Sequence, residues 1–313
     1  MSFHFHPTET LEKGFRRILD EEISRVQAVL RASNINKAKA VHDARRTFKK
    51  MRAVLRLVRP AIDPEPYDTL NKTFRDWGRE LSASRDAYVV TQTLNMLLQR
   101  YENYLDEEPI NIIRAYLQAQ YKKSRHDNPL TRADMIALAD QMPEVLDFID
   151  DKSLITNRLS ILTGGLEQTY IAGMKAFDNA RANKEAPLFH EWRKQTKYLW
   201  HHHQLLNLYW PAIMEAYSDE YHRLSELLSD EHDLAILHNR LQQDDMQQLY
   251  ESYRDPLDCC IRDQQNALRQ SAIDKGRMLF SESPNIFVKR IKQYLKNGRL
   301  AQSGEAEANT DAV

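Results

Sequence analysis

The segment from Val41 to Arg59, VHDARRTFKKMRAVLRLVR, constrains the fold of this chain more than any other stretch. It carries seven Lys and Arg side chains against a single carboxylate, Asp43. At about 100° per residue it forms a helix with two different faces. The apolar face holds Phe48, Met51, Val54, Leu55 and Val58, and the basic face holds His42, Arg45, Arg46, Lys49 and Arg56 with the small Ala53. The pattern predicts a helix that packs on one side and presents cations on the other.

The basic face predicts an anionic ligand. Like charges three or four residues apart destabilise an isolated helix by about 0.2 to 0.5 kcal/mol per pair, and an anion would relieve that repulsion. An ordinary solvated basic helix is the alternative interpretation of this segment taken alone.

A second segment, Phe189 to Leu206, FHEWRKQTKYLWHHHQLL, repeats this face. One constant offset places His190 on His42, Arg193 on Arg45, Lys194 on Arg46, Lys197 on Lys49 and His201 on Ala53. Downstream of the two segments stand LSASRD (81–86) and LSDEHD (228–233), at nearly the same distance. Two spaced motifs that recur in the same order indicate a duplicated architecture.

The repeated pattern H-x-x-[RK]-[RK]-x-x-K, followed by L-x-x-x-R-D or a variant, resembles the CHAD domain, a histidine-containing α-helical domain that binds inorganic polyphosphate. The resemblance extends from about Glu9 to Asn297. The second copy departs from the first because His232 stands where the first copy has Arg85, and Tyr198 stands where it has Lys50. The second half is therefore expected to be less basic.

The composition favours an all-α protein. Only 8 of 313 residues are glycine, and long stretches rich in helix formers repeat apolar residues with a helical period. Hydrophobic residues make up 42% of the chain, which is enough for a substantial core. The formal net charge is −1, so the basicity is local and favours a focused anion site over diffuse nucleic-acid binding.

The predicted architecture is two tandem four-helix bundles, residues 1–150 and 151–300, related by a pseudo-twofold internal repeat and followed by a disordered acidic tail, residues 301–313. Spacing shows only that the two basic faces are equivalent. That long antiparallel helices bring them together around one basic central channel is what the resemblance implies.

Several element boundaries follow from local signals. A first helix is expected to begin after Thr8 or Thr10 and to reach about Arg31, and Pro60 is expected to end the basic helix. The next helix is expected to run from about Pro66 through Arg85. Its expected inward side chains are Phe74, Trp77, Leu81 and Tyr88. A connector interrupted at Pro143 should follow near residues 132–149, and a last short helix should cover residues 284–296.

Inorganic polyphosphate is the ligand that the resemblance implies, and successive phosphates of such a chain can each meet an Arg or Lys. The residues expected to bind it are His42, Arg45, Arg46, Lys49, Arg52 and Arg56 in the first half and His190, Arg193, Lys194, Lys197 and His201 in the second. Secondary candidates, each with the alternative of an ordinary surface cation, are Arg85, Arg114, Arg262 and Arg269.

Three other functions compete with this hypothesis. A histidine metal site needs paired donors on one helix face, yet His42 and His190 have cations four residues later, so no metal is expected. A phosphate-processing enzyme would need a phosphate loop or Mg²⁺-binding carboxylates; Gly164 and Gly165 lack the lysine of such a loop and favour a packing or kink site in a helix. A general nucleic-acid binder would need aromatic side chains between the cations, but Phe48 and Trp192 lie on apolar sides.

The expected setting is a reducing cytoplasm. Three purposes of binding stay open: tethering to polyphosphate granules, sensing of the phosphate state, or recruitment of another protein. The two cysteines, Cys259 and Cys260, are adjacent and offer no disulfide framework. No apolar stretch approaches the length of a membrane span. The sequence therefore predicts a non-enzymatic protein without cofactor or membrane segment, whose partner is inorganic polyphosphate and not a specific nucleic-acid sequence.

Overall fold

The computed structural model describes residues 3–81, 85–127, 130–150, 158–243 and 245–310. All regular elements in these ranges are helices, which confirms the predicted all-α class. The first half holds α1 (Leu11–Arg31), α2 (Lys37–Val58), the 3₁₀ turn η1 (Arg59–Ala61), α3 (Pro64–Glu80), α4 (Arg85–Arg100), α5 (Glu107–Asp127), α6 (Arg132–Gln141) and α7 (Pro143–Asp150). The second half holds α8 (Leu159–Asn183), α9 (Ala186–Leu205), η2 (Asn207–Tyr209), α10 (Pro211–Leu241), α11 (Gln247–Glu251), α12 (Arg254–Leu279) and α13 (Pro284–Thr310).

The predicted start of α1 and the predicted end of α2 are confirmed. Thr10 caps α1, since its side chain accepts a hydrogen bond from the backbone N–H of Lys13 at 3.3 Å. Asn36 caps α2 in the same way through Ala38 N at 2.9 Å. Pro60 lies in η1, directly after α2. These helix ends are thus determined by local side-chain chemistry.

The long helix expected from Pro66 through Arg85 is two helices in the structure, α3 and α4. The matching segment of the second half is the single 31-residue helix α10. Three of the expected inward side chains are buried: Phe74, Trp77 and Leu81. The prediction for Tyr88 is wrong, because this residue lies on the separate helix α4 and is 47% exposed.

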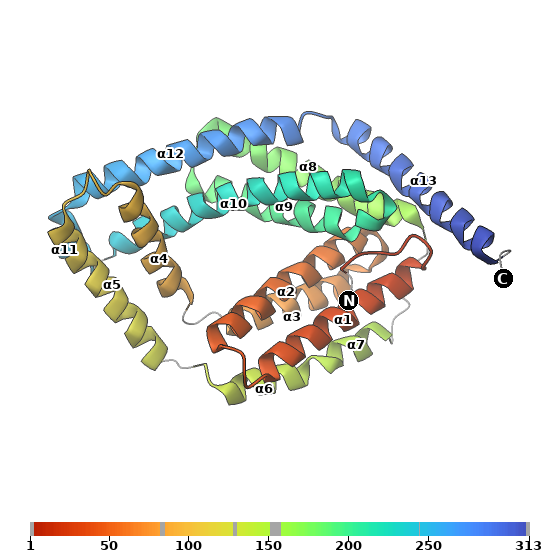
Figure 1. Cartoon of the computed structure of the whole chain (residues 1–313), viewed down its shortest axis with the longest axis horizontal. Coiled ribbons are helices and arrows are strands. Elements are labelled where there is room, and N and C mark those ends of the chain that lie inside the picture. Colours follow the sequence, from red (N-terminus) through yellow and green to blue (C-terminus); the bar gives the residue numbers. More distant parts are fainter. Residues whose placement is uncertain (1–2, 82–84, 128–129, 151–157, 244, 311–313) are drawn as a thin grey trace.

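Four helices of the second half pack around one another. Helix α9 lies between α8 and α10, while α12 packs on both α10 and α8; they occupy the upper part of Figure 1. Helix α2 joins the two halves because it contacts α8 and α9 as well as α1 and α3. Where α8 crosses α2, Gly165 meets the backbone of Leu57, which confirms the predicted packing role of this glycine.

The buried apolar residues form two clusters. The larger one draws on α1 to α3, α6 to α10, α13 and the end of α12. The smaller one joins α4 and α5 to α11, the end of α10 and most of α12, at the left of Figure 1. Both clusters take residues from both sides of residue 150. A division of the chain at that point, the pseudo-twofold repeat and the central channel stay predictions from the sequence.

The predicted connector forms α6 and α7, which pack on α1 and are interrupted near Pro143 as expected. Helix α13 is longer than predicted, since it continues past Lys296 to Thr310. Gly298 lets this helix touch the backbone of Tyr209, and Gln302 Nε2 donates to Leu208 O at 2.8 Å. The helix thus includes residues 301–310, for which the sequence predicted disorder, and the contacts of Gly298 and Gln302 hold its middle part against η2.

Candidate anion-binding site

A basic cavity of about 110 Å³ lies between α2 and α9. Its lining consists of Lys49 and Arg52 from α2 and His190, Arg193, Lys194, Lys197, Tyr198 and His201 from α9. All of these except Tyr198 were candidate residues, so the tertiary structure brings cations of both predicted basic helices to one place. Among the described side chains, no carboxylate lines this cavity.

A buried hydrogen bond holds the two basic helices together beside this cavity. His202 Nε2 of α9 donates to the backbone carbonyl of Ala53 in α2 at 3.0 Å. Both residues are fully buried. Ala53 occupies the basic face of α2 in the sequence pattern, and its small side chain lets α9 approach at this position. The alanine thus serves the contact between the helices.

Three guanidinium groups are oriented by hydrogen bonds to neighbouring helices. Arg45 Nη1 donates to Gly78 O of α3 at 2.5 Å. Arg52 Nε donates to Asn71 Oδ1 of α3 at 2.9 Å. Arg193 Nε donates to Ser229 Oγ of α10 at 2.9 Å. A guanidinium group has five N–H donors in a planar fork, so one such bond sets its direction.

Lys50 belongs to the packing of α1 and does not line the cavity. Its Nζ lies 3.8 Å from Glu22 Oε1 and 4.3 Å from the centre of the Phe3 ring. Burial lowers its pKa from the ordinary value. The matching residue of α9, Tyr198, lies in the cavity wall, and the guanidinium of Arg56 stacks 4.6 Å from its ring centre. The departure of the second copy at this position therefore removes no cation from the cavity.

Glu191 holds one of the cavity cations by an ion pair. Its carboxylate accepts from Lys194 Nζ at 2.5 Å and from Gln195 Nε2 at 2.6 Å. Burial acts to raise the pKa of Glu191, but the bonds from Lys194 and Gln195 outweigh it and keep that pKa below its ordinary value. An incoming anion must compete with this carboxylate for Lys194.

The three consecutive histidines of α9 are buried and uncharged. His201 lines the cavity and stacks on Trp200 with 4.5 Å between ring centres. Burial lowers its pKa to about 3, and burial also lowers the pKa of His203 to about 4 and that of His202 well below 6.5. His203 Nδ1 donates to Leu199 O at 2.7 Å, and its ring stacks on Tyr217 and Tyr221. His201 is therefore a wall residue and not a cation of the site.

These histidines predict a loss of stability in mild acid. Above about pH 6.5 they are neutral in both the folded and the unfolded chain and contribute no pH dependence. As the pH falls below 6.5, the unfolded chain binds protons that the folded chain excludes. Each buried histidine then lowers the free energy of unfolding by about 1.4 kcal/mol per pH unit, until the pH reaches its folded-state pKa.

The measurement is urea unfolding between pH 7.5 and pH 4.5 for the native protein and for His203→Asn. Asparagine keeps an amide donor for Leu199 O but cannot titrate, so the pH slope should decrease by about 1.4 kcal/mol per pH unit. An equal slope in both proteins would show that His203 does not contribute to the acid sensitivity.

A histidine pair borders the same cavity. The Nδ1 atoms of His190 on α9 and His232 on α10 are 3.3 Å apart, and the ring centres are 4.3 Å apart. Burial, followed by the charge of Arg193, lowers the pKa of His232 to about 4. The residue was noted in the sequence only as the counterpart of Arg85. The repeated L-S-x-x-x-D motif was the signal that marked the positions of both His232 and Ser229.

Three of the secondary candidates, Arg114, Arg262 and Arg269, do not line this cavity. Arg269 donates through Nε and Nη2 to Glu231 Oε1 at 2.9 and 2.6 Å, so it neutralises a buried carboxylate. Arg114 donates to Asn111 Oδ1 on α5, and Arg262 donates to Asp258 O on α12. The side chain of Arg85 lies outside the described residues. His42 and Arg46 are exposed on α2.

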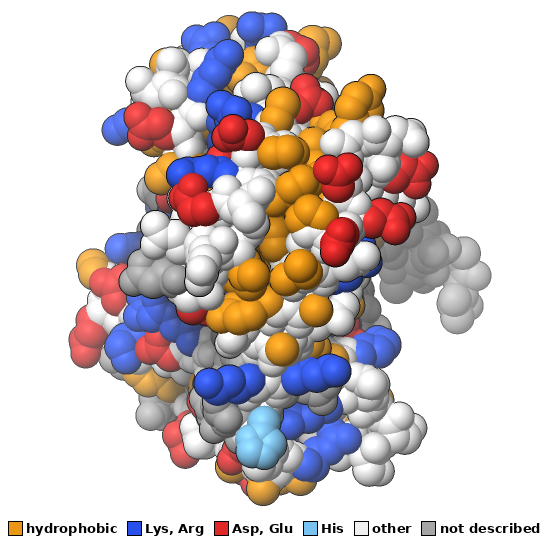
Figure 2. Space-filling model, turned by 90° about the vertical axis from the view of Figure 1, so that its left-hand side faces the viewer, with side chains coloured by type: hydrophobic (Ala, Val, Ile, Leu, Met, Phe, Trp, Pro, Cys, Tyr) orange, Lys and Arg blue, Asp and Glu red, His pale blue; other side chains and the backbone are white. Residues whose placement is uncertain are grey.

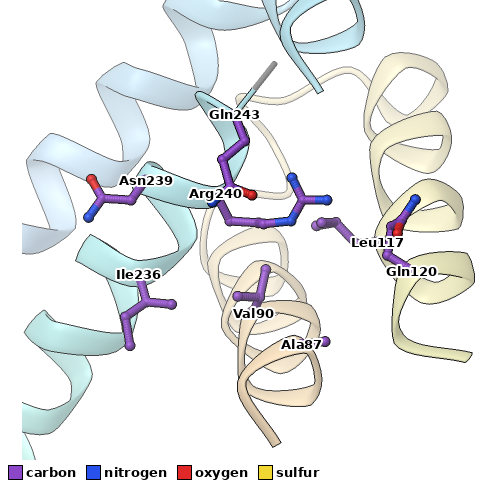
Figure 3. A pocket seen from close by; sticks show the side chains of 8 residues that line it. All are labelled: Ala87, Val90, Leu117, Gln120, Ile236, Asn239, Arg240 and Gln243. Atoms are coloured by element: carbon purple, nitrogen blue, oxygen red, sulfur yellow. The ribbon is translucent and has the colours of Figure 1, made fainter. Parts of the chain in front are cut away.

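A second cavity, of about 300 Å³, lies between α4, α5 and α10 and has a different character (Figure 3). Its walls are largely apolar, with Val90, Leu117 and Ile236 beside several amides. Among the lining residues that the structure describes, Arg240 alone is charged. Asp245 binds both terminal nitrogens of Arg240 at 2.8 and 2.6 Å. Figure 2 shows hydrophobic side chains gathered across the middle of this end of the molecule. Such a surface does not suit a polyanion.

The described part of the chain contains neither a metal-binding cluster nor a membrane-spanning helix. Within the ranges given above, no group of three or more His, Cys, Asp or Glu side chains is arranged to hold a metal ion. Among the described helices, none has the length and hydrophobicity to cross a bilayer.

Comparison with known proteins identifies the family. The family model of the CHAD domain matches residues 14–242, nearly three quarters of the chain. The chain belongs to the CHAD family. Its fold is similar to the crystal structure of the CHAD domain from the plant Ricinus communis, with a TM-score of 0.58 and 19% sequence identity over 90% of this chain and 96% of that chain. Comparison with curated proteins gave no match. The family match ends at residue 242, before α11 to α13.

Proposed function

We propose that this CHAD protein binds inorganic polyphosphate, without catalysis, at the cavity between α2 and α9 and on the basic surface that adjoins it. The observation that carries the proposal is the lining of one cavity by cations from both repeated helices. A linear chain of phosphates offers one anionic group after another to such a row. Each charge-assisted hydrogen bond contributes about 1.5 to 3 kcal/mol before ordering costs.

The aromatic side chains near the cavity disfavour a nucleic-acid ligand. Phe48 and Trp192 are 1% and 0% exposed, and Tyr198 is 7% exposed with Arg56 over its ring. Bases bind single-strand proteins largely by stacking on accessible aromatic rings. The cavity lining contains several cations but few accessible aromatic ring faces. Such a lining suits a ligand that has no bases.

The lining also favours binding over turnover. Phosphoryl transfer commonly relies on Mg²⁺ held by carboxylates next to the reacting phosphate. The lining side chains that the structure describes include no carboxylate, and nearby Glu191 is engaged by Lys194 and Gln195. A phosphate-processing enzyme is therefore the weaker alternative. Cytoplasmic location and targeting to polyphosphate granules are the setting that we propose for this binding.

The proposal is tested by comparing long-chain polyphosphate with single-stranded DNA of equal charge, at matched salt. Binding to polyphosphate is expected to be at least about tenfold tighter, and the affinity should fall steeply with salt because bound counterions are released. Equal affinity for both polymers would favour general nucleic-acid binding. Phosphate release from polyphosphate during the measurement would instead support the enzymatic alternative.

The Glu191→Gln variant is expected to bind polyphosphate about threefold more tightly than the native protein. The substitution removes a negative charge that competes with the ligand for Lys194, and an exposed ion pair of this kind contributes at most about 1 kcal/mol. Fluorescence anisotropy of a labelled polyphosphate measures the change. Glu215→Gln removes the same charge from an exposed position on α10 and serves as the matched control. Equal gains in both variants would reveal an effect of net charge only.

A further inference from the structure

The contact between His190 and His232 has a consequence for ligand binding. Their Nδ1 atoms lie 3.3 Å apart, within hydrogen-bond distance, and the rings come from different helices. His190 lines the basic cavity. His232 experiences the charges of Lys49 and Lys197, two further lining residues from α2 and α9. The pair is therefore part of the electrostatic surroundings of the cavity.

The hydrogen bond determines where the protons of a neutral pair are placed. One ring must carry hydrogen on Nδ1 and donate, so its Nε2 is a bare acceptor. The other ring must accept at Nδ1, so its hydrogen is on Nε2. A neutral pair thus presents one donor and one acceptor at its two Nε2 atoms. An oxyanion only accepts hydrogen bonds, so it can bind the Nε2 that donates but not the Nε2 that is a bare acceptor.

We propose that the His190–His232 pair takes up a single proton from solution when the cavity binds a polyphosphate oxyanion, and that it then contacts the anion as a two-donor unit. The proton adds to the bare Nε2, no covalent bond breaks, and the hydrogen bond between the two Nδ1 atoms is kept. A second proton would have to occupy the accepting Nδ1, which would break that bond and place two imidazolium ions face to face. One proton per pair is therefore the limit. The inference rests on the proposed function and names His232 as a binding residue.

The charges around the pair determine the direction of the effect. The charged groups that face or adjoin the pair come from three helices: Lys49 of α2; Glu191, Arg193, Lys194 and Lys197 of α9; and Glu231 and Asp233 of α10. Glu231 is itself paired with Arg269 of α12. Burial and these cations lower the pKa of both histidines in the ligand-free protein. A bound polyanion neutralises the cations, so the pKa of the pair rises on binding.

The affinity for polyphosphate is expected to depend on pH. Because the bound state holds a proton that the free state lacks, affinity rises as the pH falls from about 8 toward 5.5. A pair that takes up one proton changes the affinity by at most about tenfold per pH unit, whereas two independent histidines would reach about a hundredfold. The internal phosphates of a long chain are fully ionised in this range and add little to the trend.

The experiment is isothermal titration of the full-length protein with long-chain polyphosphate at about pH 6, in two buffers of different ionisation enthalpy. The difference in heat between the buffers counts the protons taken up. The proteins are the native chain, His190→Gln, His232→Gln, the double variant, and His126→Gln as a control that removes an exposed imidazole from α5. The double variant should lose this proton uptake, which is at most one proton; each single variant should lose no more than the double variant, because one histidine remains, and the control should lose none.

Two results would overturn the proposal: losses in the single variants that add up to more than one proton, which mean independent titration, or undiminished proton uptake in the double variant. Absence of polyphosphate binding by the native protein would instead contradict the proposed function itself. Tight binding without proton uptake would contradict the histidine pair alone. Because the His190 side chain is exposed, His190→Gln carries the test even where His232→Gln reduces the folded fraction.

Discussion

Replacing Lys49 and Lys197 together by alanine is expected to weaken polyphosphate binding about 100-fold. The two lysines come from the two repeated helices, α2 and α9, and line the same cavity. Each single variant should lose about tenfold in affinity, or about 1.4 kcal/mol of binding free energy. This value is just below the range for one charge-assisted hydrogen bond, because the contact lies near solvent. Thermal stability should change little, because each substitution relieves repulsion among neighbouring cations.

The matched control for this pair is Lys122→Ala with Lys123→Ala on α5. It removes the same charge from exposed positions outside the cavity lining. We expect the control to lose less than about threefold in affinity, because it changes only the net charge of the protein. Binding measured by anisotropy at several salt concentrations distinguishes the two cases, since loss of direct phosphate contacts also reduces the salt slope. If Lys197→Ala alone left the affinity unchanged, a site shared by both helices would be refuted.

Gly165→Ala is expected to destabilise the protein by about 3 kcal/mol or more, or to prevent folding. A Cβ at this position of α8 would lie 1.9 Å from the backbone oxygen of Leu57 in α2 and 2.6 Å from its carbonyl carbon. The obstructing atoms belong to a helix backbone, so rotation of a side chain cannot relieve the overlap. Overpacking a core typically costs about 1 to 3 kcal/mol when side chains can adjust, and here α8 must move away from α2.

The neighbouring glycine provides an internal control. A Cβ at Gly164 would come no closer than 3.4 Å to Pro60, an ordinary van der Waals contact. Gly164→Ala should therefore be neutral or should stabilise the protein by up to about 1 kcal/mol, since alanine has the higher helix propensity. Urea unfolding measures both variants. Similar behaviour of the two would show that α8 and α2 do not approach closely at Gly165.

The sequence alone determined the features that depend on neighbours along the chain. The periodic separation of apolar and basic residues placed α2 and α9 correctly, because a helix turns every residue by a constant angle. Thr10 and Pro60 marked two helix ends, because a capping side chain and a proline act on backbone groups only a few residues away. The repeated histidine and cation spacing identified the family, which the family match confirms.

Tertiary structure decided which of the predicted cations share one cavity. The spacing on α2 treats Lys49 and Arg45 alike, yet Lys49 lines the cavity while Arg45 bonds to the carbonyl of Gly78. The positions of Arg269 beside Glu231 and of His232 beside His190 depend on helices that are distant in sequence. A helix pattern records which side of one helix is polar, but not which neighbour faces it.

The same distinction applies to the fold. The sequence predicted helices throughout and a duplicated plan, but the split of one long helix into α3 and α4, and the burial of α4 and α5 against α10 to α12, appeared only in the structure. An amphipathic face specifies that a surface must be covered, and any apolar surface of matching shape can cover it. Helix type and basic face are thus local properties of this chain, while the shared cavity depends on how α2, α8 and α9 pack together.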